Sequence, residues 1–153
     1  MLISIFMLGW FSGSAVSKIT KEQFPLGNVA PERPSPGDWI KPEQIHVFKD
    51  KVVIDVDNPS WAVFTDTNSM DPVFDVEANT IEIKPKSPKD IKVGDIISYK
   101  SNLCKCIVVH RVVKKGIDKD GFYFIVKGDN NPTEDPEKVR FNQIVGVVVG
   151  VIY

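Results

Sequence analysis

The chain has 153 residues, with 19 Lys and Arg against 20 Asp and Glu and a formal net charge of −1. Its length suits one domain with a short appendage, because domains commonly hold about 100 to 150 residues. The charge balance leaves no basic surplus to neutralise phosphates, so no nucleic-acid partner is expected.

The first segment, residues 1–17, is apolar and contains no ionisable side chain. As a helix it would extend about 25 Å, slightly less than the hydrocarbon core of a bilayer, which is about 30 Å thick. We expect an N-terminal apolar helix that anchors the chain in a membrane. Two alternatives remain open: a secretory signal peptide, which the small residues at positions 15–17 favour, and a buried or disordered leader.

Residues 18–43 predict a spacer between this leader and the rest of the chain. Five of the eleven prolines lie between positions 24 and 42. Because proline fixes φ and lacks a backbone donor, the segment is expected to be extended, semi-rigid and outside the core. Lys18 and Lys21 follow the apolar leader and nothing basic precedes it, so the positive-inside rule alone would leave the following domain in the cytoplasm.

From residue 44 to residue 153 the pattern is that of a mainly β domain with antiparallel strands. Short runs with alternating or β-branched residues predict a hairpin over 44–48 and 52–57, and further strands over 80–84, 95–100, 106–114, 122–127 and 143–153. Residues 115–121 predict a polar hairpin loop, and a short helix is expected only after Ser69. The last run is apolar on both faces, which predicts a strand covered on both sides.

The two cysteines, Cys104 and Cys106, form a C-x-C pair. This spacing matches neither paired zinc ligands nor a C-x-x-C redox motif. On a strand the two side chains would project from the same face, where a disulfide between them would need unusual geometry. We therefore expect ordinary strand residues.

Ser69 is the first candidate for chemistry. Asp71 and Pro72 follow it, and proline moves the preceding backbone away from the α-helical region. A serine at such a bend would present its hydroxyl outward and leave N–H groups free to stabilise an oxyanion. The alternative is a serine that only caps a helix.

His110 is one of only two histidines and shares a strand face with apolar neighbours. A core histidine bonded to a carbonyl is the alternative reading, and His46 is assigned no role. Asp129 and Asp135 lie in a polar segment, residues 128–136, that has the composition of a turn. One carboxylate could orient the imidazole while the other supports it. A serine, a histidine and an aspartate are the groups of acyl-transfer catalysis.

Four short segments stand out together: residues 67–72 (TNSMDP), 93–99 (VGDIISY), 109–112 (VHRV) and 127–131 (KGDNN). In this order they resemble the S-M-x-P box, the G-D-[IVL]-[IV] strand, the H-R-V box and the G-D-N-N box of type I signal peptidases. The resemblance to this family extends from about residue 60 to residue 153. Bacterial members use a Ser-Lys dyad, whereas archaeal and endoplasmic-reticulum members have histidine in place of the lysine. With His110, the chain is similar to the latter type.

The resemblance implies a role for each matched residue. Ser69 would be the nucleophile, His110 the general base and Asp129 its acidic partner, with Asp135 as a second functional aspartate. The supporting residues at the oxyanion site would be those flanking the nucleophile, Thr67 and Met70.

The resemblance also implies a mostly β catalytic domain on a membrane anchor, acting as a serine endopeptidase. Such an enzyme removes signal peptides from secreted or membrane preproteins after small residues, and it needs neither metal nor cofactor. Its partners would be preprotein signal peptides and membrane lipid, with partner subunits an open question, and its catalytic domain would be extracytoplasmic. The implied location conflicts with the positive-inside rule applied above.

Two other functions remain open. One is a self-cleaving or processing peptidase of the repressor type, which uses a lysine base and carries a helical DNA-binding domain, features that this sequence lacks. The other is a β-domain that kept the four boxes as turns and binds a peptide without cutting it.

Overall fold

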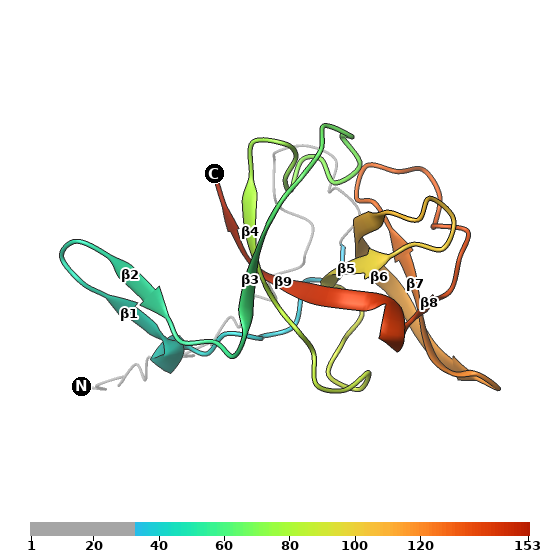
Figure 1. Ribbon diagram of the computed structural model, residues 1–153, viewed down its shortest axis with the longest axis horizontal. Helices are drawn as coiled ribbons and strands as arrows, with labels where there is room; N and C mark the ends of the chain where they lie inside the picture. Colours follow the sequence, from blue (N-terminus) through green and yellow to red (C-terminus); the bar gives the residue numbers. More distant parts are fainter. Residues whose placement is uncertain (1–32) are drawn as a thin grey trace, which may run out of the picture. The chain divides into compact units, whose positions relative to one another are not determined.

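A seven-stranded antiparallel sheet organises residues 33–153, the part of the chain that the computed structural model describes (Figure 1). In sheet order the strands are β3 (Pro59–Val63), β4 (Asn79–Ile83), β9 (Ile144–Ile152), β5 (Ile96–Lys100), β6 (Ile107–Asp118), β7 (Gly121–Lys127) and β8 (Val139–Arg140). The mainly β, antiparallel fold is therefore confirmed. The expected apolar helix at 1–17 and the spacer as far as residue 32 lie outside the described residues. Between residues 33 and 153, no helix has the length and apolar character needed to cross a membrane.

Two strands form a separate hairpin, β1 (Ile45–Val47) and β2 (Val52–Ile54). It agrees with the hairpin predicted around the polar turn at 49–51. Short 3-10 helices, η1 (Pro42–Gln44) and η2 (Phe141–Gln143), precede β1 and β9.

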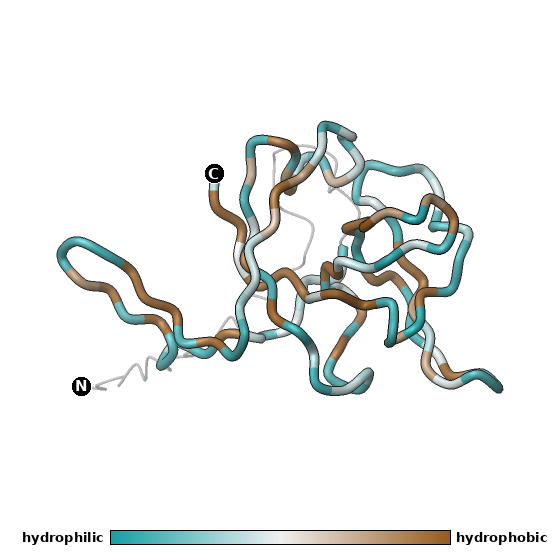
Figure 2. The backbone as a smooth tube through the Cα atoms, viewed as in Figure 1, coloured by the Kyte–Doolittle hydropathy of each residue, from teal (hydrophilic) through white to brown (hydrophobic). Residues whose placement is uncertain are grey.

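The last strand, β9, lies between β4 and β5 in the interior of the sheet. Its side chains enter hydrophobic clusters on both faces of the sheet, Ile144 and Val147 in one and Val148 in the other. The prediction of a strand covered on both sides is thus confirmed for most of β9, but its end is open, because Ile152 is 53% exposed. Figure 2 shows hydrophobic residues along β9 and its neighbours, while the turns between strands are hydrophilic.

Two hydrophobic clusters take alternate residues of β5, since successive side chains of a strand point to opposite faces. One cluster contains Ile97 and Tyr99 with residues of β6, β7 and β9. The other contains Ile96, and with it Met70 and Phe74 from the segment that follows β3. The second cluster therefore fixes the chain around Ser69 on the sheet.

The hairpin between β6 and β7 is tighter than expected. The predicted loop over 115–121 is wrong, because β6 continues to Asp118 and Lys115 and Ile117 pair with Phe124 and Phe122. Only residues 119 and 120 separate the strands, and Gly121 adopts a positive φ of 97°. The Lys115 ammonium donates to the Ile91 carbonyl at 2.7 Å. This tertiary hydrogen bond satisfies the charged group and allows lysine at this position of the strand.

Three further features differ from the sequence predictions. The segment after Ser69 forms hydrogen-bonded turns rather than a helix, with Val73 N–H donating to the Met70 carbonyl at 2.9 Å. Strand β3 begins with Pro59 and was not predicted, and proline is tolerated there because β3 is an edge strand. Strand β8 has only two residues and leaves no periodic signal.

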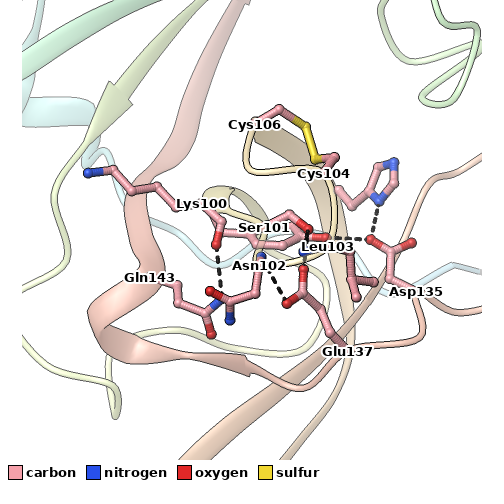
Figure 3. Close-up of a disulfide and its surroundings, with 11 residues drawn as sticks. Lys100, Ser101, Asn102, Leu103, Cys104, Cys106, Asp135, Glu137 and Gln143 are labelled. Atoms are coloured by element: carbon pink, nitrogen blue, oxygen red, sulfur yellow. Dashed lines mark hydrogen bonds and ion pairs between the residues drawn. A yellow bond between two sulfur atoms is a disulfide. The ribbon is translucent and has the colours of Figure 1, made fainter.

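Cys104 and Cys106 form a disulfide, so the expectation of ordinary strand residues is wrong (Figure 3). Both precede β6, which begins at Ile107. Lys105 between them has a positive φ of 55°, and the resulting bend brings the two Cα atoms to 5.2 Å. That distance lies within the normal range for disulfides.

The described end of the proline-rich segment contacts the sheet. Gly37 N–H donates to the buried Asp95 carboxylate at 2.6 Å, and Trp39 packs against the cluster of Ile97 and Tyr99. Gly94 has a φ of 104°, and a Cβ there would lie 2.1 Å from the Ser35 carbonyl oxygen. The Gly-Asp pair before β5 therefore serves to hold residues 34–39 against the sheet.

Candidate active site

A cavity of about 470 Å³ lies between the chain that follows β3 and the start of β6. Four of the six residues singled out from the sequence line it: Thr67, Ser69, Met70 and His110. The remaining lining residues are Ala62, Val63, Phe64, Thr65, Phe74, Asp75, Cys106, Ile107, Val108, Val109 and Asn131. The fold thus brings the candidate nucleophile and base to the wall of one cavity, although 41 positions separate them in the sequence.

Ser69 lies in a turn whose neighbours fix it from both sides. Asn68 before it has a positive φ of 54°, a conformation that asparagine tolerates better than most residues. Met70 after it is 3% exposed and packs in the second cluster. The Thr67 hydroxyl lies 3.1 Å from Ser69 Oγ and accepts from Ser69 N–H at 3.4 Å. The serine is half-buried and faces the cavity with its neighbouring hydroxyl.

The G-D-N-N segment holds the serine turn in place. Asn130 donates twice, from its N–H to the Ser69 carbonyl and from Nδ2 to the Asn68 carbonyl, each at 2.9 Å. A Cβ at Gly128 would lie 2.6 Å from the Ser69 carbonyl oxygen. Glycine is therefore required at position 128 for the two turns to approach this closely.

His110 lies on β6, is 7% exposed and has an aspartate on one ring nitrogen. Its Nδ1 lies 2.6 Å from Asp135 Oδ2, and the same oxygen accepts from the Tyr99 hydroxyl at 2.6 Å. Asp135 is itself tied to the sheet, because its N–H donates to the Val126 carbonyl at 2.8 Å. With Nδ1 engaged, Nε2 is the nitrogen left for chemistry.

Asp129 does not contact His110, and the role given to it from the sequence is corrected here. Its two oxygens accept from Arg111 Nε at 2.8 Å and from Arg111 Nη2 at 2.7 Å. The cause is the alternation of β6, in which the adjacent residues His110 and Arg111 project to opposite faces. Asp135 contacts the side chain of His110 on one face of β6, and Asp129 contacts that of Arg111 on the other.

Arg111 is the residue that sequence reasoning missed. Besides Asp129 it bonds the Gly94 carbonyl through Nη1 at 2.8 Å, so it connects the G-D-N-N turn to the start of β5. The sequence does contain a sign of its role, because Arg111 is a charged residue inside an apolar strand. A charged side chain that is buried there needs a partner of opposite charge. Asp129 in the neighbouring turn was available for that pairing.

The other histidine, His46, lies on the β1–β2 hairpin. Its Nε2 lies 2.9 Å from Asp55 Oδ2, and it does not line the cavity. Among residues 33–153, His110 is therefore the histidine that lines the same cavity as Ser69. A hydroxyl, an imidazole and a carboxylate are the groups that acyl transfer uses.

No protein-family model matches the chain. It is 52% identical over 44 residues to the uncharacterized protein MJ0260 of Methanocaldococcus jannaschii, a match covering 29% of this chain and 22% of that protein. It is 31% identical over 105 residues to the signal peptidase complex catalytic subunit sec11 of Pyrenophora tritici-repentis, and 29% identical over 111 residues to that of Tuber melanosporum.

Each match to a Sec11 protein covers 63% of this chain and 60% of the relative, so the chain spans about three fifths of the length of these relatives. Over that stretch it is distantly similar to signal peptidase catalytic subunits, which supports at this broad level the resemblance drawn from its four motifs.

Proposed function

We propose that this protein is a membrane-attached serine endopeptidase that removes signal peptides from preproteins. The observation that carries the proposal is the 2.6 Å contact between His110 Nδ1 and Asp135 Oδ2, with His110 in the wall of a cavity that Ser69 also lines. The distant similarity to signal peptidase catalytic subunits supports the same activity.

In the proposed reaction, Ser69 Oγ attacks the scissile carbonyl and His110 Nε2 accepts its proton. The imidazolium then gives the proton to the leaving amine, and water hydrolyses the acyl-enzyme. Asp135, rather than Asp129, keeps the Nδ1–H tautomer and stabilises the imidazolium. None of these steps requires a metal ion or cofactor.

The Thr67 hydroxyl is proposed as a donor to the oxyanion, because it lies 3.1 Å from Ser69 Oγ and opens to the same cavity. Met70 supports this site through its burial beside Phe74. The Arg111–Asp129 pair acts indirectly. It fixes the G-D-N-N segment, whose Asn130 is hydrogen-bonded to the Ser69 carbonyl.

The substrate is proposed to bind as an added strand. The end of the edge strand β3 with the two residues after it (62–65) and the start of β6 with the residue before it (106–109) both line the cavity. An extended peptide that lies along these segments can bond their backbones, while its side chains enter the cavity. Phe64 and Phe74 stack at 4.6 Å between ring centroids and restrict the space there, which favours small residues before the cut.

For the whole chain we propose an anchor at 1–17, a spacer that ends by residue 32 and a peptidase domain on the extracytoplasmic side. The domain is proposed to begin before residue 44, where composition placed it, because Gly37 and Trp39 contact the core. The Sec11 relatives are named as subunits of a signal peptidase complex. We therefore propose that activity can depend on partner subunits. For this reason the test below also uses native membranes, in which such subunits would be present.

The test is cleavage of a preprotein with a small-x-small site, with purified protein in detergent and with membranes that contain it. Ser69→Ala and His110→Ala are each expected to lower the rate by at least about 10³-fold, since each removes a group that takes part in proton transfer or attack. His46→Ala is the matched control and should cleave normally. Cleavage that persists in Ser69→Ala would overturn the proposal.

Binding of the preprotein without cleavage, in detergent and in membranes, would instead identify the peptide-binding module considered from the sequence. The cleavage site is read by mass spectrometry of both fragments. A cut elsewhere than after the small residues would contradict the proposed substrate class.

A further inference from the structure

We propose that Tyr99 is a positioning residue that keeps Asp135 ionised and sets the proton affinity of His110. The inference rests on the proposed function and concerns the same site. From its sequence position alone, Tyr99 is only a residue of a predicted strand.

The sheet places Tyr99 beside the histidine. In the register of β5 and β6, Ile97 lies opposite His110 and Tyr99 lies opposite Val108. Tyr99 and His110 therefore project from the same face and are diagonal neighbours, a spacing of about 7 to 8 Å between backbones that long side chains can bridge. Tyr99 is 1% exposed, so its ring is fixed by the first hydrophobic cluster.

One carboxylate oxygen connects the two side chains. Asp135 Oδ2 lies 2.6 Å from the Tyr99 hydroxyl and 2.6 Å from His110 Nδ1. Because the side chain of Asp135 is only 13% exposed, solvent contributes little to satisfying this oxygen. Because the Tyr99 hydroxyl donates to Oδ2, this oxygen is an acceptor, and we assign it the same role toward His110 Nδ1. This assignment places the imidazole proton on Nδ1 and leaves Nε2 free to act as the base.

The charges around Tyr99 favour this protonation state. Burial raises the pKa of the Tyr99 hydroxyl well above its ordinary value, and the hydrogen bond to Asp135 and the negative charges of Asp135 and Glu137 raise it further. The hydroxyl thus keeps its proton, and remains a donor to Asp135, well above neutral pH.

Glu137 has hydrogen-bond partners of its own. It accepts from the Ser101 hydroxyl and, at 3.2 Å, from Asn102 N–H, in the loop that carries the Cys104–Cys106 disulfide (Figure 3). On the opposite face of β6, Arg111 and Asp129 compensate each other. Tyr99 and His110 are therefore the donors that face Asp135 among the described residues.

Removal of the Tyr99 hydroxyl has a defined consequence. Its hydrogen bond disperses part of the negative charge on Oδ2, so without it the carboxylate attracts the protonated imidazole more strongly. The midpoint of the His110 titration should then move to higher pH, by about one unit, which is the scale for loss of a charge-assisted hydrogen bond. A purely structural role of the ring would leave this midpoint unchanged.

The first experiment titrates the His110 imidazole by NMR in the full chain, in wild type and in Tyr99→Phe, without substrate. Tyr123→Phe is the matched control, because Tyr123 lies on β7 with its ring under Lys138 Nζ at 4.3 Å. We expect an upward shift in Tyr99→Phe and none in Tyr123→Phe. An unchanged or lowered midpoint in folded Tyr99→Phe overturns the inference.

A second variant keeps the test decisive if Tyr99→Phe fails to fold. Incorporation of 3-fluorotyrosine at position 99 retains the ring and makes the hydroxyl a stronger donor, so the His110 midpoint should move to lower pH. A shift upward or none contradicts the inference.

The acid limb of the kcat/KM profile for preprotein cleavage should move in the same direction as the NMR midpoint in each variant. If the wild-type protein cleaves no preprotein, the proposed function fails while the NMR titration still decides the role of Tyr99. If cleavage is normal and the midpoint does not move, only the role of Tyr99 fails.

Discussion

Asp129 and Asp135 are six residues apart in the sequence but contact side chains that project from opposite faces of one strand. Asp129 neutralises Arg111, whose side chain is 9% exposed, and Asp135 accepts from His110. A turn rich in Gly, Asn and Pro presents both carboxylates without a regular period, so only the strand that it meets assigns their roles. The ion pair with Arg111 and the contact with His110 are thereby kept on separate faces of β6.

Glu82 gives a prediction at this scale. It is 2% exposed on β4, where Oε2 accepts from the Ser98 hydroxyl at 2.6 Å. Its Oε1 and the Thr80 hydroxyl have no hydrogen-bond partner among the described residues. Burial raises the pKa of the Glu82 carboxyl, and the bond from Ser98 offsets this only in part.

The sign follows from the raised pKa. The folded protein holds the Glu82 proton more tightly than the unfolded chain does, so this residue favours folding most below the unfolded pKa of glutamate. That contribution is lost as the pH rises through the raised, folded value. Glu82→Gln should therefore narrow the difference in unfolding free energy between pH 5 and pH 8, measured with urea. Glu77→Gln, on an exposed turn, is the control, and an equal effect in both variants would contradict the prediction.

Among the elements, the contact between two turns matters most for the site. The serine turn after β3 and the G-D-N-N turn after β7 are joined by two hydrogen bonds from Asn130. They can approach this closely because Gly128 has no Cβ. Neither turn is part of the sheet, so the site can be displaced while the strands remain paired.

Gly128→Ala tests this contact. A Cβ 2.6 Å from the Ser69 carbonyl oxygen forces the two turns apart. Displacement of a positioned nucleophile by about 1 Å costs about 10²-fold in rate. Far-ultraviolet circular dichroism should stay that of the wild type. Gly150→Ala is the control, because a Cβ there meets Ile81 at an ordinary 3.7 Å. Full activity in Gly128→Ala would show that the serine turn does not depend on this approach.

The strands of the sheet were predictable where β-branched and aromatic residues gather over five residues or more, as in β4, β5 and β7. The edge strand β3 was missed because it begins with proline, and β8 because two residues carry no period. The Cys104–Cys106 disulfide was missed for a related reason: it depends on a bend at Lys105, and the sequence there looked like the start of a strand. Ser69 and His110, both singled out from the sequence, line one cavity, whereas the pairings of Asp129 and Tyr99 depend on sheet register.

For the molecule as a whole, the contacts of residues 33–39 bear on where the domain begins. Asp95 is fully buried and accepts from Gly37 N–H, Trp39 packs against the core, and Gly94 approaches Ser35 closely. Removal of these residues would leave part of the Asp95 carboxylate without its donor and expose the core beside Trp39.

A fragment of residues 33–153 should therefore be more stable than a fragment of residues 44–153, the domain boundary predicted from composition. Burial of the Trp39 ring alone contributes on the order of 2 kcal/mol. Thermal unfolding of both fragments measures the difference, with Trp39→Ala in the longer fragment as the control for the ring. Equal midpoints would place the domain start at residue 44.

The central claim, that Ser69, His110 and Asp135 form the catalytic set, is tested most directly by the rate of preprotein cleavage per folded molecule in Asp135→Asn and Asp129→Asn. Asp135→Asn should lose about 10³ to 10⁴ in rate while remaining folded, because the wrong imidazole tautomer is favoured. Asp129→Asn should lose stability, by roughly 3 kcal/mol, since it leaves Arg111 without its charged partner. It should retain most of the wild-type rate per folded molecule. The reverse ranking, with Asp135→Asn active and Asp129→Asn folded but inactive, would contradict the claim.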